Sequence, residues 1–310
     1  MQNTVGTNPI LSLNNRSLDV LVHVVINSLP SPRSKRVYHM AIRHFVGYLQ
    51  SQKEPVLDKL FLQTYISAMQ DEGIGEASIN LRLAAIRKLS REAEELKIWP
   101  ETVTAAFVSV KKIPQRGKHI GNWLTLEQAQ QLINAPDIAP PRGLRNRAIL
   151  ATLLGCGIRR NELVNLSPAQ LQVREGRWVI TDLVGKRNKT RTVTVPFWVK
   201  QCIDAYLAAT QICSGRLFQA MCKGGRIQRD HISSESVYEL VKRYGRQCGF
   251  SITPHDLRRT YAKLALKNGA RIDQIQLNLG HESLATTQVY LGNELDLKNG
   301  PGDFLPIQIA

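Results

Sequence analysis

Four side chains that could do chemistry on an anionic group lie near the C-terminal end of the sequence. His255 and Arg258 are three residues apart, His281 follows a Leu-Gly pair, and Tyr290 lies a short way beyond it. Arginine forks bind anionic oxygens, histidines exchange protons near neutral pH, and a tyrosine hydroxyl can act as a nucleophile. This stretch therefore predicts a site that combines anion binding, proton transfer and nucleophilic attack.

Three short helices are expected to position these side chains. Thr253 as N-cap and Pro254 as first helical residue predict the start of the first helix, and Gly269 predicts its end. A second periodic segment over 272–279 stops at a glycine, and Ser283 can cap a third helix that carries the tyrosine. The helices would bring the two histidines, the arginine and the tyrosine within reach of one another.

A further arginine candidate lies upstream, in the segment GlyCysGlyIleArgArgAsnGluLeu at 155–163. Its glycines permit a turn, after which Arg159 and Glu162 lie three apart on a new helix and can form an ion pair. Arg160 is a second candidate, but the spacing to Glu162 favours Arg159. Taken alone, this pair would be no more than a surface salt bridge.

The boxes at 155–163, HisAspLeuArgArg at 255–259, LeuGlyHis at 279–281 and Tyr290 resemble, in this order, those of the tyrosine recombinases. These are also called phage integrases and include the Xer/integrase-like enzymes. The resemblance implies a site-specific recombinase that cleaves and rejoins DNA through a 3′-phosphotyrosine intermediate, without metal or ATP. The biological outcome could be integration, excision or resolution of a DNA element.

The resemblance also implies a role for each matching residue. Arg159 and Arg258 would bind the phosphate, Tyr290 would attack it, His255 would accept the phenol proton and His281 would donate a hydrogen bond to the phosphate. Glu162 would support Arg159.

A lysine is expected on a hairpin turn. Segments 178–184 and 191–195 are rich in β-branched residues, and a preceding strand at 171–173 would complete a three-stranded antiparallel sheet. The turn between the last two strands carries Lys186 and Lys189. The family carries its catalytic lysine, a general acid, on such a turn; Lys186 is the matching residue and Lys189 the alternative.

Composition agrees with a polyanionic partner. The chain carries 41 Lys and Arg against 25 Asp and Glu, for a formal net charge of +16. Such charge favours nucleic acid but leaves anionic membranes and ribosomes open. We find no membrane span or signal peptide, which predicts a cytoplasmic protein. The five cysteines are scattered, as reduced thiols are, and no third ligand accompanies the two histidines, so neither metal nor cofactor is expected.

The length of 310 residues predicts two domains in a mainly α fold with a small antiparallel β-sheet. Residues 1–15 would be a loose tail and 16–107 an all-helical domain of four helices, the last ending at Trp99 and Pro100. This domain looks like the SAM-like core-binding domain of the recombinases. Residues 108–121 would form a basic linker, and 122–310 an α+β catalytic domain with a C-terminal tail.

Cations on the expected helical faces and in the linker are DNA-binding candidates, although a plain solvated basic surface explains any one of them equally well. The set comprises Arg33, Lys35, Arg36, Arg43, Arg82, Arg87, Lys88, Arg91, Lys111, Lys112, Arg116 and Lys118. The basic loop over 215–229 is a further DNA-facing candidate.

The resemblance implies double-stranded DNA with a specific recombination site as partner, and a homotetramer on that DNA. The apolar segment at 304–310 would pass to a neighbouring protomer. Two alternatives remain: a relaxing topoisomerase of the tyrosine type, and a catalytically silent DNA-binding protein of the same fold. The full set of site residues argues against the silent protein.

Overall fold

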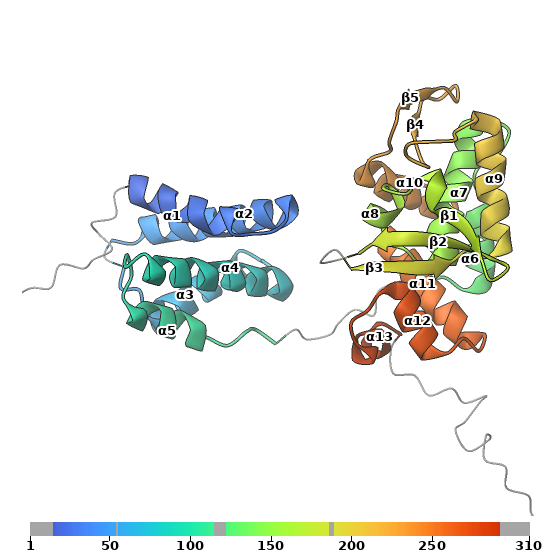
Figure 1. The fold of residues 1–310 in the computed structure, drawn as a ribbon. Coiled ribbons are helices and arrows are strands. Elements are labelled where there is room, and N and C mark those ends of the chain that lie inside the picture. The colour runs from blue at the N-terminus through green and yellow to red at the C-terminus, as the bar shows by residue number, and fades with distance from the viewer. Residues whose placement is uncertain (1–14, 54, 115–121, 186–188, 292–310) are drawn as a thin grey trace, which may run out of the picture. The chain divides into compact units, whose positions relative to one another are not determined.

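The computed structural model describes residues 15–53, 55–114, 122–185 and 189–291. The chain divides into two compact units, Met1–Lys118 and His119–Ala310. Unit 1 is helical, and unit 2 combines helices with two small sheets (Figure 1). The mainly helical fold class that the sequence predicts is confirmed.

Five helices build unit 1: α1 (Asn15–Asn27), α2 (Pro32–Ser51), α3 (Lys59–Asp71), α4 (Glu76–Glu95) and α5 (Glu101–Ser109). Ser31 caps α2 by accepting a hydrogen bond from the Ser34 amide, and Pro32 occupies the first turn. Aromatic rings fill the core: Phe45 packs edge-on against Tyr65 at 5.3 Å and against Phe107 at 6.1 Å between centroids.

The expectation of four helices ending at Trp99 and Pro100 is wrong. Pro100 is the N-cap of α5, and Phe107 on that helix is fully buried in the same core. Proline lacks an amide hydrogen, so it is tolerated where a helix starts as readily as where one ends. A single proline therefore does not tell the end of a domain from the start of its last helix.

Unit 2 contains helices α6 (Leu126–Asn134), α7 (Pro141–Cys156), α8 (Arg160–Leu163), α9 (Phe197–Thr210), α10 (Ser234–Gln247), α11 (Pro254–Lys267), α12 (Ile272–Leu279) and α13 (Leu284–Leu291). Helix α7 begins at Pro141, with Pro140 as its N-cap. It is buried around most of its circumference and packs against α6, α9 and α11, as a helix that is apolar on most sides must be.

The antiparallel sheet β1 (Leu171–Arg174), β2 (Arg177–Val184) and β3 (Thr190–Thr194) confirms the three predicted strands. The Gly185 amide donates to the Lys189 carbonyl at 2.8 Å and so closes the turn after β2. The predicted basic loop over 215–229 instead contains a short hairpin, β4 (Ala220–Met221) with β5 (Ile227–Arg229). Strands this short carry too little periodicity to be seen in sequence.

The three helices expected around the histidines are α11, α12 and α13. Thr253 and Asp256 form the reciprocal cap of α11, and Gly280 ends α12 with φ of 62°. Ile275, Leu279 and Leu291 form a small separate core with α11. Within the described part of the chain, we find no helix long and apolar enough to cross a membrane.

Candidate active site

The carboxylate of Glu162 is the centre of a buried ion-pair network. It lies on the short helix α8 and is 3% exposed. One oxygen accepts from Arg159 Nη1 at 2.8 Å and the other from the Arg159 amide at 2.7 Å. The predicted pair therefore forms, although Arg159 is the N-cap of α8 and not a residue of a longer helix.

A second arginine, Arg191 on β3, binds the same carboxylate. Its two terminal nitrogens contact the two Glu162 oxygens at 2.9 Å each, and its Nε donates to the Asn278 carbonyl at 2.8 Å. Burial alone would raise the pKa of Glu162, but the hydrogen bonds from Arg191 and Arg159 outweigh it and lower the pKa. The carboxylate therefore stays ionised between two guanidinium groups.

Arg258 is held at the ends of two helices and is 2% exposed. Its Nη1 donates to the Gly157 carbonyl at 2.6 Å, and its Nη2 donates to the Leu279 carbonyl. These carbonyls lie at the C-termini of α7 and α12, where helix dipoles favour a cation. Burial and the nearby Arg159 lower the pKa of Arg258 to about 10, which still leaves it charged at neutral pH.

Tyr290 on α13 lies between the two histidines. Its ring centroid is 5.3 Å from that of His255 and 5.3 Å from that of His281, both edge-on. The Arg259 guanidinium lies over the phenol ring at 5.1 Å, and the Tyr290 hydroxyl donates to the His255 carbonyl at 3.2 Å. The structure thus brings the residues predicted from 255–290 into one site.

Burial and neighbouring arginines keep both histidines neutral at physiological pH. For His281, burial, then Arg258 and Arg159, lower the pKa to about 4. For His255, partial burial, then Arg259 and Arg258, lower the pKa below its ordinary value. Burial raises the pKa of Tyr290, although Arg258 and Arg259 oppose it, so the phenol keeps its proton.

The structure describes only one of the two candidate lysines, Lys189. Lys186 lies outside the described residues. Lys189 is exposed and pairs with Glu282 at 3.3 Å. A methyl group added to Gly185 would lie 3.7 Å from Arg159 Nη1, so the start of this turn adjoins the predicted phosphate-binding arginine.

An open cleft of about 540 Å³ lies beside these residues. Arg159, Arg191 and His281 line it together with the turn residues Gly185 and Lys189. Among the described residues, no group of three or more His, Cys, Asp or Glu is placed to hold a metal ion. The cleft therefore presents fixed cations and the neutral imidazole of His281 to an anionic ligand.

Comparison with known proteins shows the family to which this chain belongs. Residues 122–295 match the phage integrase family, and residues 23–96 match the phage integrase N-terminal SAM-like domain. The chain belongs to the phage integrase family. Tyrosine recombinase XerA of Thermococcus onnurineus is 30% identical over 266 residues, which is 84% of each chain. Tyrosine recombinase XerC of Pelotomaculum thermopropionicum is 29% identical over 87% of this chain and 90% of its own.

Solved structures share the recombinase fold. The XerH site-specific recombinase bound to a palindromic difH substrate aligns with a TM-score of 0.71 at 18% identity, over 91% of this chain and 82% of its own. A lambda integrase dimer bound to a COC' core site aligns with a TM-score of 0.69 at 18% identity, over 94% and 84%. The expected enzyme class, a tyrosine site-specific recombinase, is confirmed.

Sequence reasoning missed three polar residues of this recombinase site: Arg191, Arg259 and Thr287. Arg191 shares one face of its strand with Val193 and Val195, both buried, so alternation within the strand could have revealed it. Thr287 is fully buried, and its Oγ1 lies 2.9 Å from His281 Nδ1. A lone threonine or second arginine on a helix carries no such signal.

The DNA-binding candidates of the recombinase fall into four groups. Exposed cations are Arg33, Arg36, Arg43, Arg91, Lys111 and Lys112, of which Arg43 pairs with Asp19 at 3.1 Å; Lys35 is half-buried. Two cations have partners inside unit 1: Lys88 pairs with Glu92 at 3.0 Å, and Arg87 donates to the Phe107 and Val110 carbonyls. Arg82 belongs with them, because it interacts with Tyr65 and its Nη1 is buried. Arg116 and Lys118 lie outside the described residues.

Proposed function

We propose that this chain cleaves and rejoins DNA strands at a specific site through a 3′-phosphotyrosine on Tyr290, using no metal and no ATP. The observation that carries the proposal is the position of the Tyr290 hydroxyl. The Tyr290 ring stands edge-on to the rings of both His255 and His281, and its hydroxyl lies within the field of Arg258. A phenol placed among neutral imidazoles and buried guanidinium groups suits attack on a phosphodiester.

Arg159 and Arg258 bind the two nonbridging oxygens of the scissile phosphate in this proposal. Their guanidinium groups are held in advance by Glu162 and by two main-chain carbonyls, so little reorganisation accompanies the reaction. Negative charge grows on those oxygens in the transition state, and fixed cations stabilise it more than mobile water does. Loss of one such donor costs about 10² to 10³ in rate.

The Tyr290 oxygen attacks phosphorus while His255 accepts the phenol proton. The P–O5′ bond breaks, and Lys186 protonates the leaving 5′ oxygen, which yields a 3′-phosphotyrosine and a free 5′ hydroxyl. Neutral His281 donates a hydrogen bond to the phosphate. Reversal by the 5′ hydroxyl of another strand joins the DNA without ATP, because the ester retains the energy of the broken bond.

Covalent trapping tests the proposal. Wild-type protein and Tyr290→Phe are incubated with DNA from the source, including the flanks of the gene, and quenched in detergent. Protein-linked fragments are then sequenced. Adducts from wild type alone, at a recurring inverted repeat, support the proposal and define the site.

Three other outcomes contradict it. Adducts scattered without sequence preference favour a relaxing topoisomerase. If a nicked substrate that traps the covalent intermediate also gives no adduct while DNA is bound, the chain is a silent DNA-binding protein. Adducts from Tyr290→Phe would move the nucleophile to another residue.

The partner in this proposal is duplex DNA, which the exposed cations of unit 1 contact along the phosphates. Arg33 and Arg36 on α2 and Arg91 on α4 are exposed. None of the three forms an ion pair with another described residue, so their guanidinium groups can contact phosphates. The division into a helical domain at 16–107, a linker at 108–121 and a catalytic domain at 122–310 belongs to the same proposal, with the linker beginning only after Ser109, where α5 ends. A cytoplasmic location belongs to it as well.

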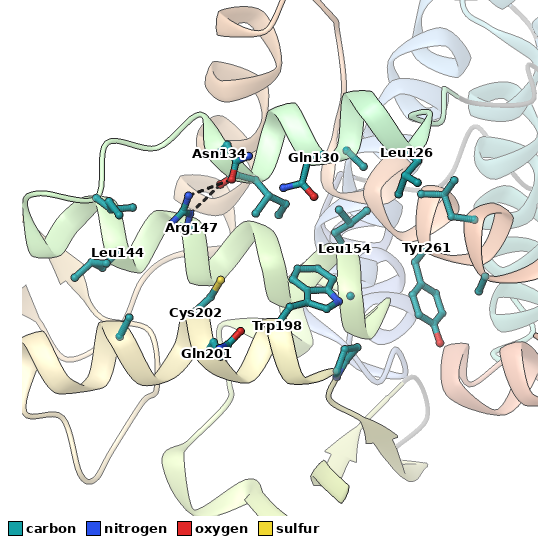
Figure 2. A pocket seen from close by; sticks show the side chains of 18 of the residues that line it. Leu126, Gln130, Asn134, Leu144, Arg147, Leu154, Trp198, Gln201, Cys202 and Tyr261 are labelled. Atoms are coloured by element: carbon teal, nitrogen blue, oxygen red, sulfur yellow. Dashed lines mark hydrogen bonds between the residues drawn. The ribbon is translucent and has the colours of Figure 1, made fainter. Parts of the chain in front are cut away.

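A tetramer on DNA also requires contacts between protomers. An apolar groove of about 700 Å³ runs between α6, α7, α9 and α11 (Figure 2). Leu126 and Trp198 line it although they are 61% and 41% exposed. We assign this groove to residues 304–310 of a neighbouring protomer, PheLeuProIleGlnIleAla, because that segment is apolar and follows a Gly-Pro-Gly hinge.

Deletion of residues 302–310 and Leu126→Lys should each prevent assembly of protomers on DNA, and the double variant should be no worse. Leu126 is exposed, so the fold tolerates the lysine. Unchanged assembly and recombination by the deletion would remove the tail from the proposal. Full assembly by Leu126→Lys would assign the tail to another surface.

A further inference from the structure

Arg191 binds the same Glu162 carboxylate as Arg159, the arginine that is proposed to bind the phosphate. It reaches into the site from β3 and is 11% exposed at its side chain. Its three guanidinium nitrogens all have acceptors: the two Glu162 oxygens and the Asn278 carbonyl. Such a bidentate arrangement fixes the plane of the carboxylate as well as its position.

The Glu162 carboxylate has four donors, and two of them come from Arg191. The other two are the amide and Nη1 of Arg159. The oxygen that holds the Arg159 side chain is also bound by Arg191 Nη1, so any rotation of the carboxylate breaks both bonds together. Arg191 therefore determines where Glu162 holds the Arg159 guanidinium.

Two glycines leave room for the Arg191 side chain. A methyl group at Gly280 would lie 3.0 Å from Arg191 Cδ, and one at Gly185 would lie 3.3 Å from Arg191 Nη1. Gly280 is the glycine of the LeuGlyHis box, and Gly185 begins the turn with the candidate lysines. The side chain thus lies against Gly280, the residue before His281, and against Gly185, where the turn after β2 begins.

The bond from Arg191 Nε to Asn278 ties this junction to α12. Asn278 in turn donates from Nδ2 to the Cys156 carbonyl at 2.9 Å, at the end of α7. Leu279, the next residue, supplies a carbonyl to Arg258. One connected set of hydrogen bonds therefore relates the two phosphate-binding arginines to each other.

We propose that Arg191 is a positioning residue for catalysis: through Glu162 and the Asn278 carbonyl it holds Arg159 in register with Arg258. This inference rests on the proposed strand cleavage. It adds a residue that does not itself contact the phosphate and that belongs to none of the motif boxes.

Single-turnover adduct formation at the trapped site tests the proposal, with Arg191→Met, Arg191→Lys and Arg174→Met. Arg191→Met should slow cleavage about 100-fold at unchanged DNA affinity, assayed below the melting temperature of each variant. The cleavage rate of Arg191→Lys should lie between those of wild type and Arg191→Met, because one ammonium cannot reach both Glu162 oxygens and the Asn278 carbonyl. Arg174→Met, on the exposed edge strand β1 of the same sheet, should match wild type.

A double variant of Arg191 and Glu162→Gln distinguishes positioning through Glu162 from a merely structural role of Arg191. If Arg191 acts through Glu162, the double variant cleaves no more slowly than the slower single variant. The proposal would be overturned if the rate losses of the two single variants multiplied in the double variant. It would also be overturned if the cleavage rates followed only the melting temperatures of the variants.

A readout without DNA keeps this inference distinct from the proposed function. In nitrogen-15 NMR of the guanidinium groups, wild-type Arg159 should show slow rotation about its Cζ–Nη1 bond, because Glu162 holds that nitrogen. Arg191→Met, or Arg191→Lys if the first does not fold, should speed the rotation, whether or not adducts form. An unchanged Arg159 signal overturns the inference, while absence of wild-type adducts alone counts only against strand cleavage.

Discussion

The Tyr290 hydroxyl donates to the main-chain carbonyl of His255 at 3.2 Å, while the imidazole of the same residue stands edge-on to the phenol ring at 5.3 Å between centroids. The phenol proton is therefore bound to an oxygen that cannot remove it. Proton transfer to the neutral His255 imidazole therefore requires the hydroxyl to break this hydrogen bond. This geometry predicts that proton transfer to His255 accompanies phosphate binding.

Strand cleavage should depend on pH through His255. Its pKa lies below the ordinary value, so the ring is neutral and basic at pH 7 and becomes inactive only when protonated at lower pH. Single-turnover rates measured from about pH 5 to pH 9 should fall on the acid side with an apparent pKa below about 6.5. His255→Asn should be slow and should lack this acid limb; a limb that persists would assign the base to another group.

Thr287 should matter through the tautomer of His281. If the Thr287 hydroxyl donates to Nδ1, the neutral ring carries its proton on Nε2, where it can face a phosphate. Thr287→Val should reduce the cleavage rate about tenfold, within the range for one acid–base or hydrogen-bonding group. Thr287→Ser keeps the hydroxyl and should restore the rate; equal rates for valine and serine would remove the hydroxyl from the mechanism.

Glu162 should stabilise the fold in a pH-dependent way. A carboxyl whose folded pKa is depressed adds stability above its unfolded pKa, and this stability is lost as pH falls through the folded pKa. Glu162→Gln should unfold more easily than wild type at pH 7 by about 3–5 kcal/mol, because two guanidinium groups lose their counter-charge. In urea unfolding the gap should narrow below about pH 4.3, and a constant gap would contradict the ion-pair account.

Gly280 and Gly269 form a matched pair. Both have positive φ at the end of a helix, of 62° and 84°, but an added methyl at Gly269 meets nothing within 4 Å whereas at Gly280 it meets Arg191. Either alanine variant should lose about 1–2 kcal/mol of stability from the left-handed backbone. Only Gly280→Ala should also slow strand cleavage, because its methyl group displaces Arg191. Equal cleavage rates for both variants would show that moving the Arg191 side chain does not affect cleavage.

Arg87 and Arg91 on α4 separate stability from DNA binding. Arg87 donates to the Phe107 and Val110 carbonyls at the end of α5, whereas Arg91 is exposed. Arg87→Met should lower the melting temperature of unit 1. Arg91→Met should leave it unchanged but weaken DNA binding and reduce the slope of log affinity against log salt by about 1, measured by titration at several salt concentrations. The reverse pattern would exchange the two roles.

The sequence determined the features of this protein that depend on neighbours in the chain. The Thr253 cap, the glycine at the end of α12 and the strand pattern after Gln170 act over a few residues, so α11, α12 and the three-stranded sheet could be predicted. The order of Arg159, His255, Arg258, His281 and Tyr290 was sufficient to indicate the family.

Only the tertiary structure decided how those residues are held. Arg191 and Glu162 are 29 positions apart, and Arg258 and Gly157 are 101 apart. Contacts at such separation leave no periodic signal, because they form only when packed helices and strands bring distant groups together. The buried ion pairs and the lowered histidine pKa values depend on that packing, which excludes water and concentrates charge.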